Sequence, residues 1–296
     1  MITVSGKELY LWRKQALDLA IANSVAISEV DWLLQAITNL SSLSLSLESF
    51  QNQKQILSSK SLLQLSELWQ KRIQERQPVQ YLVETVFWRH FQLKVTPSVL
   101  IPRPETELII DIASQAAQIN TIANGEHWVD LGTGSGAIAL GLATSFPQAN
   151  IHAVDCSQEA LLVAQENAAN LGLKPKICFY QGSWWNPLHF LQGKVRGMVS
   201  NPPYIPTQQV SQLQPEVANH EPHLALDGGQ DGLDDIRHLV QVAPDYLVPG
   251  GIWLIEMMLG QSRAVVEMLE QRREYYDLEI FSDLGGIERF ALAYRR

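Results

Sequence analysis

The chain has 296 residues, of which 46% are hydrophobic and 18% are charged. This composition excludes wholesale disorder and permits one large or two ordinary domains. The formal net charge is -9 at pH 7, which disfavours a protein whose main task is to grip a phosphate backbone, because that task needs clustered Lys and Arg.

Two cysteines, Cys156 and Cys178, have no metal-ligand spacing and suggest no disulfide framework, so a reducing compartment is expected. The N-terminus lacks the basic, apolar and small-residue order of a signal peptide. No apolar run reaches the ~18 residues of a membrane span. We therefore expect a cytoplasmic protein with no membrane partner.

Residues 1–77 are predicted to form a small helical bundle. Apolar residues recur at helical spacing, as in Val30-Leu33-Leu34-Ile37. Ser28 is expected to cap the start of a helix, because its hydroxyl can accept from free backbone N–H groups. The Ser/Leu tract at 41–47 alternates like a strand, but no partner strand is evident nearby, so we interpret it as a loop. The expected role of this domain is to dock a partner or to cover a site.

Residues 78–100 are predicted to link this domain to the rest of the chain through a short β-hairpin, because the apolar period changes to two between residues 84 and 96. The next stretch, Ile101-Pro102-Arg103-Pro104-Glu105-Thr106-Glu107, leads from a loop into a helix. Pro104 suits a first helical turn, and Glu105 and Glu107 favour the positive end of the helix.

From residue 126 onward, strands and helices alternate, which predicts a doubly wound, mostly parallel sheet. Two strand-like runs, 278–281 and 289–294, follow one another across a turn-rich link and indicate an antiparallel pair at the sheet edge. The domain is expected to span residues 101–296. Its other predicted strands are at 127–130, 151–155, 177–180, 197–200 and 251–256.

The first of these strands runs into the segment Gly132-Thr133-Gly134-Ser135-Gly136 and then into an apolar helix. Glycines let the backbone approach a ligand closely, and a helix N-terminus offers free N–H groups. A dinucleotide fingerprint would be G-x-G-x-x-G, whereas the spacing here is G-x-G-x-G. The tighter spacing fits a nucleoside that bears a methionine tail better than a pyrophosphate.

Asp155 ends the next strand, where a carboxylate can accept hydrogen bonds from two ribose hydroxyls. An aspartate at a strand end is more often simply solvated or a helix cap, but its combination with the glycine segment favours a nucleoside site. Trp184 follows the third strand and could stack on a purine. A core position is the alternative for Trp184 and is favoured for Trp185.

Asn201-Pro202-Pro203-Tyr204 follows the fourth strand. Two prolines fix φ and remove two N–H donors, which leaves a rigid loop rich in acceptors. Such a loop can hold a planar –NH2 group, with one hydrogen bond to the Asn201 side-chain oxygen, one to the Pro202 carbonyl, and the Tyr204 ring over the plane. An ordinary proline-rich turn is the alternative for the tetrapeptide alone.

Together, these segments resemble the class I S-adenosylmethionine-dependent methyltransferases and, more closely, the release factor glutamine methyltransferases. The resemblance covers nearly the whole chain. It implies an α/β fold with a Rossmann-like, mostly parallel sheet, an antiparallel C-terminal edge strand and a helical N-terminal domain. The segments that carry it are 101–107, 130–140, 154–168, 201–205 and 221–233.

The resemblance also implies an activity: transfer of a methyl group from S-adenosyl-L-methionine to the side-chain amide nitrogen (N5) of the glutamine in the Gly-Gly-Gln motif of peptide chain release factors. S-adenosyl-L-homocysteine is the product, and no metal or direct nucleic-acid partner is expected. The implied cofactor-binding residues are Gly132, Thr133, Gly134, Ser135, Gly136, Asp155, Trp184 and Asn201. The implied substrate-binding residues are Asn201, Pro202, Pro203 and Tyr204, of which Asn201, Pro202 and Tyr204 are the catalytic candidates.

One position inside this region departs from the pattern: Ser183 stands where the family usually has an acidic residue. Two other functions remain open. Amino methyltransferases of adenine or cytosine share the order of glycine segment and Asn-Pro-Pro-Tyr, although the net charge of -9 and the lack of a large basic segment speak against them. A non-catalytic binding module with the same fold is the second, and the intact Asn201, Asp155 and glycine segment speak against it.

Overall fold

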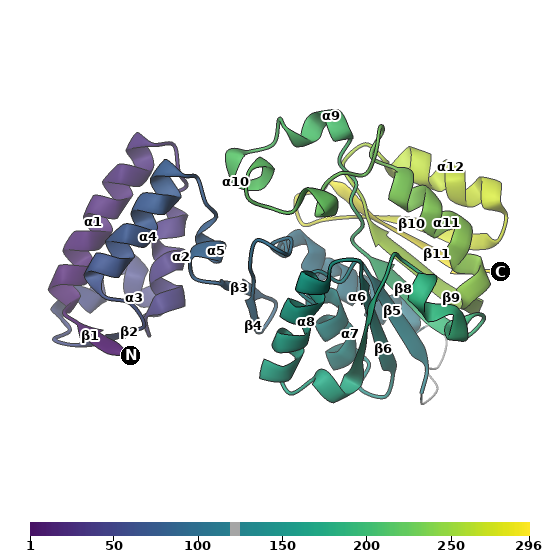
Figure 1. Ribbon diagram of the computed structural model, residues 1–296, viewed down its shortest axis with the longest axis horizontal. Helices are drawn as coiled ribbons and strands as arrows, with labels where there is room; N and C mark the ends of the chain where they lie inside the picture. Colours follow the sequence, from purple (N-terminus) through teal and green to yellow (C-terminus); the bar gives the residue numbers. More distant parts are fainter. Residues whose placement is uncertain (119–124) are drawn as a thin grey trace. The chain divides into compact units, whose positions relative to one another are not determined.

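In the computed structural model of the protein, residues 1–118 and 125–296 are described. The chain divides into two compact units (Figure 1). The first, which we call the helical unit, comprises Met1–Thr85 together with Pro215–His220, and the second, the sheet unit, comprises Val86–Gln214 and Glu221–Arg296. The chain therefore leaves the sheet unit after Gln214, joins the helical unit for one short segment, and returns.

Three longer helices build the helical unit, and α1 packs against both others. A Ser61–Gln64 capping box starts α4, in which each side chain accepts from the other residue's backbone N–H. The apolar faces meet in a core that includes Leu9, Leu33 and Trp69. The elements are β1 (Ile2–Val4), α1 (Gly6–Ala22), α2 (Ser28–Ile37), α3 (Ser42–Ser46), η1 (Ser49–Asn52), β2 (Ile56–Ser58), α4 (Leu62–Gln74), α5 (Val79–Leu82) and α10 (Pro215–Ala218).

The predicted helical region is present, but two local expectations within it are wrong. Ser28 is the first helical residue of α2, and the capping position before it is Ile27, which makes no side-chain cap. The tract at 41–47 contains the short helix α3, because the Ser41 hydroxyl accepts from the Ser44 N–H at 3.2 Å and starts a turn. The antiparallel pair of β1 and β2 was not predicted, since strands of three residues are too short to show an alternation.

The sheet unit contains a seven-stranded sheet in the order β10-β11-β9-β8-β5-β6-β7. β5 pairs in parallel with β6 and β8, and β11 pairs antiparallel with β9 and β10. The predicted mostly parallel sheet with an antiparallel C-terminal edge is therefore confirmed. The strands are β5 (His127–Leu131), β6 (Asn150–Asp155), β7 (Ile177–Gln181), β8 (Val195–Ser200), β9 (Leu247–Glu256), β10 (Tyr275–Ser282) and β11 (Glu288–Arg295).

Helices cover this sheet, and the strand order reverses at β5, between β6 and β8. A ligand site in such a sheet is expected at the carboxyl ends of the strands that flank the reversal.

The predicted hairpin is present as β3 (Thr85–Trp88) and β4 (Phe91–Lys94). The remaining helical segments are η2 (Glu105–Glu107), α6 (Leu108–Ala117), α7 (Ala137–Ser145), α8 (Gln158–Asn170), η3 (Lys174–Lys176), η4 (Asn186–Leu191), α9 (Thr207–Val210), η5 (His223–Ala225), α11 (Asp234–Tyr246) and α12 (Ser262–Arg272).

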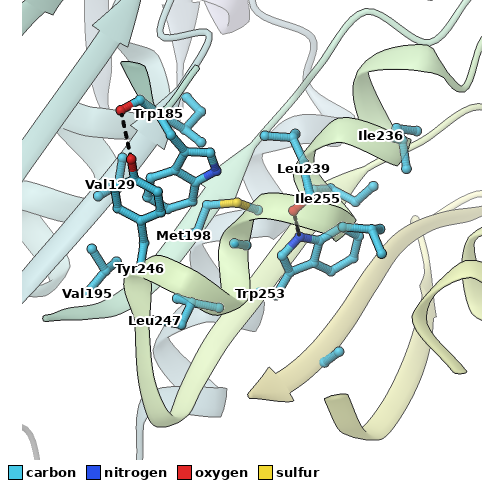
Figure 2. Packing of buried hydrophobic residues seen from close by; sticks show 14 of the residues in the cluster. Val129, Trp185, Val195, Met198, Ile236, Leu239, Tyr246, Leu247, Trp253 and Ile255 are labelled. Atoms are coloured by element: carbon cyan, nitrogen blue, oxygen red, sulfur yellow. Dashed lines mark hydrogen bonds between the residues drawn. The ribbon is translucent and has the colours of Figure 1, made fainter. Parts of the chain in front are cut away.

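A core of large side chains holds the strand ends in place (Figure 2). The ring of Tyr246 stacks on Trp185 with a centroid distance of 4.3 Å, and the Tyr246 hydroxyl donates to the Trp185 carbonyl. The Trp253 indole N–H donates to the Leu239 carbonyl at 3.3 Å. Trp185 is thus a core residue, and its burial anchors the segment that carries Trp184.

Candidate active site

A pocket of about 670 Å³ lies at the carboxyl ends of β5, β6, β7 and β8. Its size is within the ~300–1,000 Å³ typical of small-molecule sites. Each strand contributes through the residues that follow or end it: Gly132 and Gly134 after β5, Asp155 from β6, Trp184 after β7 and Asn201 after β8. The structure therefore brings together five residues that lie up to 69 positions apart in the sequence.

The glycine segment forms a tight turn in which Gly132, Gly134 and Gly136 all have positive φ. A side chain at Gly136 would place its Cβ 3.1 Å from the Cβ of Ala164. Thr133 and Ser135 are buried and lie outside the pocket lining. Their contacts stabilise the turn: the Thr133 hydroxyl donates to Asp130 at 2.6 Å, and the Ser135 carbonyl accepts from the Asn167 amide at 2.9 Å.

Asp130, the next-to-last residue of β5, is fully buried behind this turn. Its Oδ2 accepts from the Thr133 hydroxyl and, at 3.0 Å, from the Ala139 N–H in the first turn of α7. Burial without a cationic partner raises the pKa of Asp130 to about 7. The carboxylate therefore ties strand, turn and helix together rather than contacting a ligand.

Asp155 faces the pocket with both carboxylate oxygens partly engaged. Oδ2 accepts from the Gly134 N–H at 2.8 Å, and Oδ1 accepts from the Ser157 N–H at 2.9 Å. Each carboxylate oxygen can accept two hydrogen bonds, so acceptor capacity remains for a ligand. Burial raises the pKa of Asp155, and these N–H donors oppose the shift.

Trp184 has a backbone φ of 51°, a left-handed conformation that is unusual for a bulky residue. Its ring lies 3.6 Å from where a Cβ at Gly132 would be, so the absence of a side chain at Gly132 makes room for it. Gly132 therefore lets the ring of Trp184 lie at the pocket wall. Asp235, in the first turn of α11, lines the same pocket as Trp184.

The charges that line the pocket are all negative. Asp155, Glu159 and Asp235 contribute carboxylates, and none of the described lining residues is Lys, Arg or His. Burial raises the pKa of Asp155 and of Asp235. Such a site favours a cationic ligand and disfavours an anionic one such as a pyrophosphate. The other lining residues are Ser98, Val99, Leu100, Val154, Cys156, Ser157, Ala160, Gly182, Ser183, Pro203, Pro222, Leu224 and Ala225.

The loop of Asn201 to Tyr204 is divided between the pocket and the core. Asn201 and Pro203 line the pocket, whereas Pro202 is buried beside it. Tyr204 lies outside the pocket lining, and its hydroxyl donates to the buried Glu256 at 3.1 Å. The ring expected to cover an –NH2 group is thus directed at Glu256.

Residues 226–232 pack against this loop and hydrogen-bond its backbone. The Ile205 N–H donates to the Leu226 carbonyl at 3.0 Å, and the Gly228 N–H donates back to the Ile205 carbonyl at 2.9 Å. A Cβ at Gly228 would lie 2.7 Å from the Pro203 carbonyl oxygen, so only glycine permits the approach. The Gln261 side chain donates to the Tyr204 carbonyl at 3.0 Å. The backbone of the loop is therefore rigid before any ligand binds.

Comparisons with known proteins bear on this site. The family profile described as "Methyltransferase small domain" matches residues 107–230. The release factor glutamine methyltransferase of Synechocystis sp. is 51% identical over 98% of this chain and 97% of its own length. That of Thermosynechococcus vestitus is 48% identical over 98% and 99%. The chain belongs to the release factor glutamine methyltransferase family.

The fold of this family member also has a solved counterpart. The crystal structure of the hMettl16 catalytic domain, in complex with MAT2A 3′UTR hairpin 6, matches with a TM-score of 0.56 at 13% identity, over 88% of each chain. At that identity, the likeness shows a shared fold and nothing about substrate. Among residues 1–118 and 125–296, no helix is long and apolar enough to cross a membrane, and no group of three or more His, Cys, Asp or Glu could hold a metal ion.

Sequence reasoning missed several residues of this site. Asp235 looks like an ordinary acidic residue at a helix start, a position that favours negative charge whatever the function. Thr106 and Glu256 contact the Asn201 loop but lie 150 positions apart. Glu256 did carry a signal, since a carboxylate at the end of a buried strand needs a partner or a task.

Proposed function

We propose that this protein transfers the methyl group of S-adenosyl-L-methionine to the side-chain amide nitrogen of the glutamine in the Gly-Gly-Gln motif of peptide chain release factors. The observation that carries the proposal is the meeting of an acidic, nucleoside-sized pocket with the Asn201 loop, in a chain of this family. Its relatives are release factor glutamine methyltransferases, which supplies the acceptor class, and the chemistry of the site supports it.

The residues of the pocket fit the cofactor. When bound, S-adenosyl-L-methionine supplies a methyl group on a positively charged sulfonium. Asp155 retains acceptor capacity for ribose hydroxyls, and Trp184 offers an indole face for a purine. Asp155, Glu159 and Asp235 would attract the cation. The glycine turn, with Thr133 and Ser135 buried behind it, brings the backbone of Gly132 and Gly134 to the pocket wall.

The acceptor would be held by Asn201 and Pro202. An amide nitrogen is a poor nucleophile because its lone pair is delocalised into the carbonyl, so alignment matters more than acid–base chemistry. Ideal orientation is worth at most ~7–11 kcal/mol. The Asn201 Oδ1 and the Pro202 carbonyl would accept the two N–H groups and stabilise the positive charge that develops on nitrogen. The extra proton on the methylated nitrogen is strongly acidic and leaves to water without a dedicated base.

We also propose a division of labour along the chain. Residues 1–77 dock the release factor, residues 78–100 link, and residues 101–296 carry out methyl transfer. The net charge of -9 supports a protein rather than a nucleic-acid acceptor.

Mass spectrometry of a release factor incubated with the protein and S-adenosyl-L-methionine tests the proposal. One added methyl group on the glutamine of the Gly-Gly-Gln motif is expected. A release factor with that glutamine changed to alanine is the matched control and should stay unmodified. Methylation of duplex DNA or RNA in parallel reactions, with an unmodified release factor, would contradict the proposal and favour an amino methyltransferase of nucleic acids.

A further inference from the structure

A buried chain of hydrogen bonds runs from Asn201 to Glu256. The Thr106 hydroxyl donates to Glu256 Oε2 at 2.6 Å, and Asn201 Nδ2 lies 3.4 Å from Thr106 Oγ1. The Tyr204 hydroxyl donates to the second oxygen, Oε1, at 3.1 Å. Thr106 and Glu256 are 3% and 1% exposed, respectively, so water does not substitute for these contacts. Neither residue lines the pocket.

The single proton of the Thr106 hydroxyl decides how the Asn201 amide is oriented. A threonine hydroxyl has one proton and two acceptor lone pairs. Because that proton is given to Glu256, Thr106 offers only lone pairs to Asn201. The Asn201 amide must therefore turn its –NH2 toward Thr106, since the opposite orientation would set its oxygen against another oxygen. The contact of 3.4 Å is long, but the penalty for the reversed amide gives it direction.

We propose that Thr106 and Glu256 are positioning residues that fix the amide of Asn201, so that its Oδ1 faces the acceptor amide in the pocket. The inference rests on the proposed function. A reversed Asn201 would present a donor to a donor, and the acceptor –NH2 would lose one of its two hydrogen bonds. This task also gives a role to Thr106 of the segment 101–107, which does not itself line the pocket.

The charge of Glu256 sets the donor-to-acceptor direction of the hydrogen bonds that join Asn201, Thr106 and Glu256. As a carboxylate it accepts from both Thr106 and Tyr204. If it were protonated, its O–H would donate to Thr106, the Thr106 proton would turn to Asn201, and the amide would reverse. Burial raises the pKa of Glu256, the charge of Glu105 adds to that shift, and the Thr106 and Tyr204 donors and the charge of Arg289 oppose it. Methyl transfer should therefore rise with pH as Glu256 ionises.

Four variants test the proposal. Thr106→Val removes the hydroxyl at nearly constant shape, and Glu256→Gln reverses the relay by offering a donor to Thr106. We expect kcat for the release factor to fall about 100-fold in both. The dissociation constant for S-adenosyl-L-methionine should stay within about twofold. Thr106→Ser keeps the donor and should restore most of kcat. Tyr275→Phe removes a buried hydroxyl that bonds the Val240 carbonyl away from the pocket, and controls for lost stability.

Two readouts remain if a variant fails to fold or if the acceptor is misassigned. The wild-type pH profile of kcat needs no variant, and a kcat that falls as the pH rises would contradict the role of Glu256. Side-chain amide NMR of the 15N-labelled protein, with the Asn201 signal assigned by its absence in Asn201→Ala, reports the amide directly. An unchanged Asn201 signal in Glu256→Gln would overturn the positioning role of Thr106 and Glu256, even if methylation of release factors failed. The NMR experiment therefore tests this inference separately from the proposed function. Full kcat in Thr106→Val would overturn it as well.

Discussion

Buried charges are partnered differently in the helical unit and at the strand ends of the sheet unit. Arg13 lies 2.6 Å from Asp31, and Arg72 lies 2.5 Å from Glu29 and 2.8 Å from Glu216. At the strand ends, Asp155 and Glu256 are bound by N–H and O–H donors, and within the described residues no Lys, Arg or His forms an ion pair with either.

The two arrangements have different consequences. A buried ion pair is neutral overall, so the pairs of the helical unit fix structure and leave little field outside. A buried carboxylate without a cation keeps its negative potential, and its pKa is raised for the same reason. The contrast indicates where a ligand would bind: Asp155 lines the pocket and would face a cation there, whereas Glu256 lies outside the pocket lining.

The largest effect is expected from Asn201→Ala, which keeps the acidic pocket but removes the acceptor of the –NH2 group. Methyl transfer should fall at least about 1,000-fold, because an oriented group acting on developing charge is lost. Cofactor binding should weaken but persist, since Asp155 and the glycine turn remain. Transfer of labelled methyl to a release factor and calorimetry measure the two effects.

Asn170→Ala, at the exposed end of α8, is the matched control and should leave both quantities unchanged. Near-normal turnover in Asn201→Ala would end the proposed role of the loop.

The second effect addresses the helical unit. Arg72→Ala leaves Glu29 without its cation, whereas Glu216 keeps Arg76 at 2.7 Å, and removing one partner of a buried pair costs about 3–5 kcal/mol. The side chain of Arg72 is 3% exposed, so solvent screening is small. Hydrogen exchange of the α4 amides measures the loss of stability. Affinity for S-adenosyl-L-methionine should not change, because the pocket is lined by the sheet unit.

The control for this variant is Arg263→Ala, which breaks a pair with Glu267 on the surface of α12. Arg263 is 91% exposed, and exposed pairs contribute about 0–1 kcal/mol. Equal losses in the two variants would refute the contrast between buried and exposed pairs.

The third effect returns to the strand ends. Asp155→Ala should raise the dissociation constant for S-adenosyl-L-methionine about 10- to 100-fold, since hydrogen bonds to a charged group are worth ~1.5–3 kcal/mol. Asp155→Asn retains an acceptor for the Gly134 N–H and separates the charge from the shape of the turn. Unchanged affinity by calorimetry in the alanine variant would count against the ribose assignment.

The sequence predicts the sheet and the strand ends well for a physical reason. Alternation of strands and helices and the G-x-G-x-G turn are local patterns, and parallel strands bring their carboxyl ends to one edge. Gly132, Asp155, Trp184 and Asn201 therefore meet once the strand order is known. Side-chain directions are not local: two prolines fix the backbone before Tyr204, but its turn toward Glu256 depends on β9.

The same limit explains the other misses. Thr106 and Glu256 pair across 150 positions. The position of Glu256 at the end of a buried strand predicts that it needs a partner, but nothing in the sequence identifies that partner as Thr106. The sequence leaves purine stacking and a core position as alternatives for Trp184, and its left-handed backbone appears only in the folded chain. Ser28 lies inside α2 rather than before it, and the capping position Ile27 makes no side-chain hydrogen bond, so the start of this helix depends on backbone geometry that the sequence does not show.

The smallest effect sharpens the comparison at Ser183, an exposed residue of the pocket lining where the family usually has an acidic side chain. Ser183→Asp adds a fourth carboxylate to a site that already favours a cation. Because the position is exposed, we expect only about three- to fivefold tighter binding of S-adenosyl-L-methionine, near the upper end of what exposed charges contribute. The gain should shrink at high salt, where the Debye length shortens to about 3 Å at 1 M. Ser183→Asn supplies a neutral acceptor instead. Calorimetry at two salt concentrations decides between added charge and added hydrogen bonding as the cause. An equal, salt-independent gain in affinity in both variants would assign the effect to hydrogen bonding.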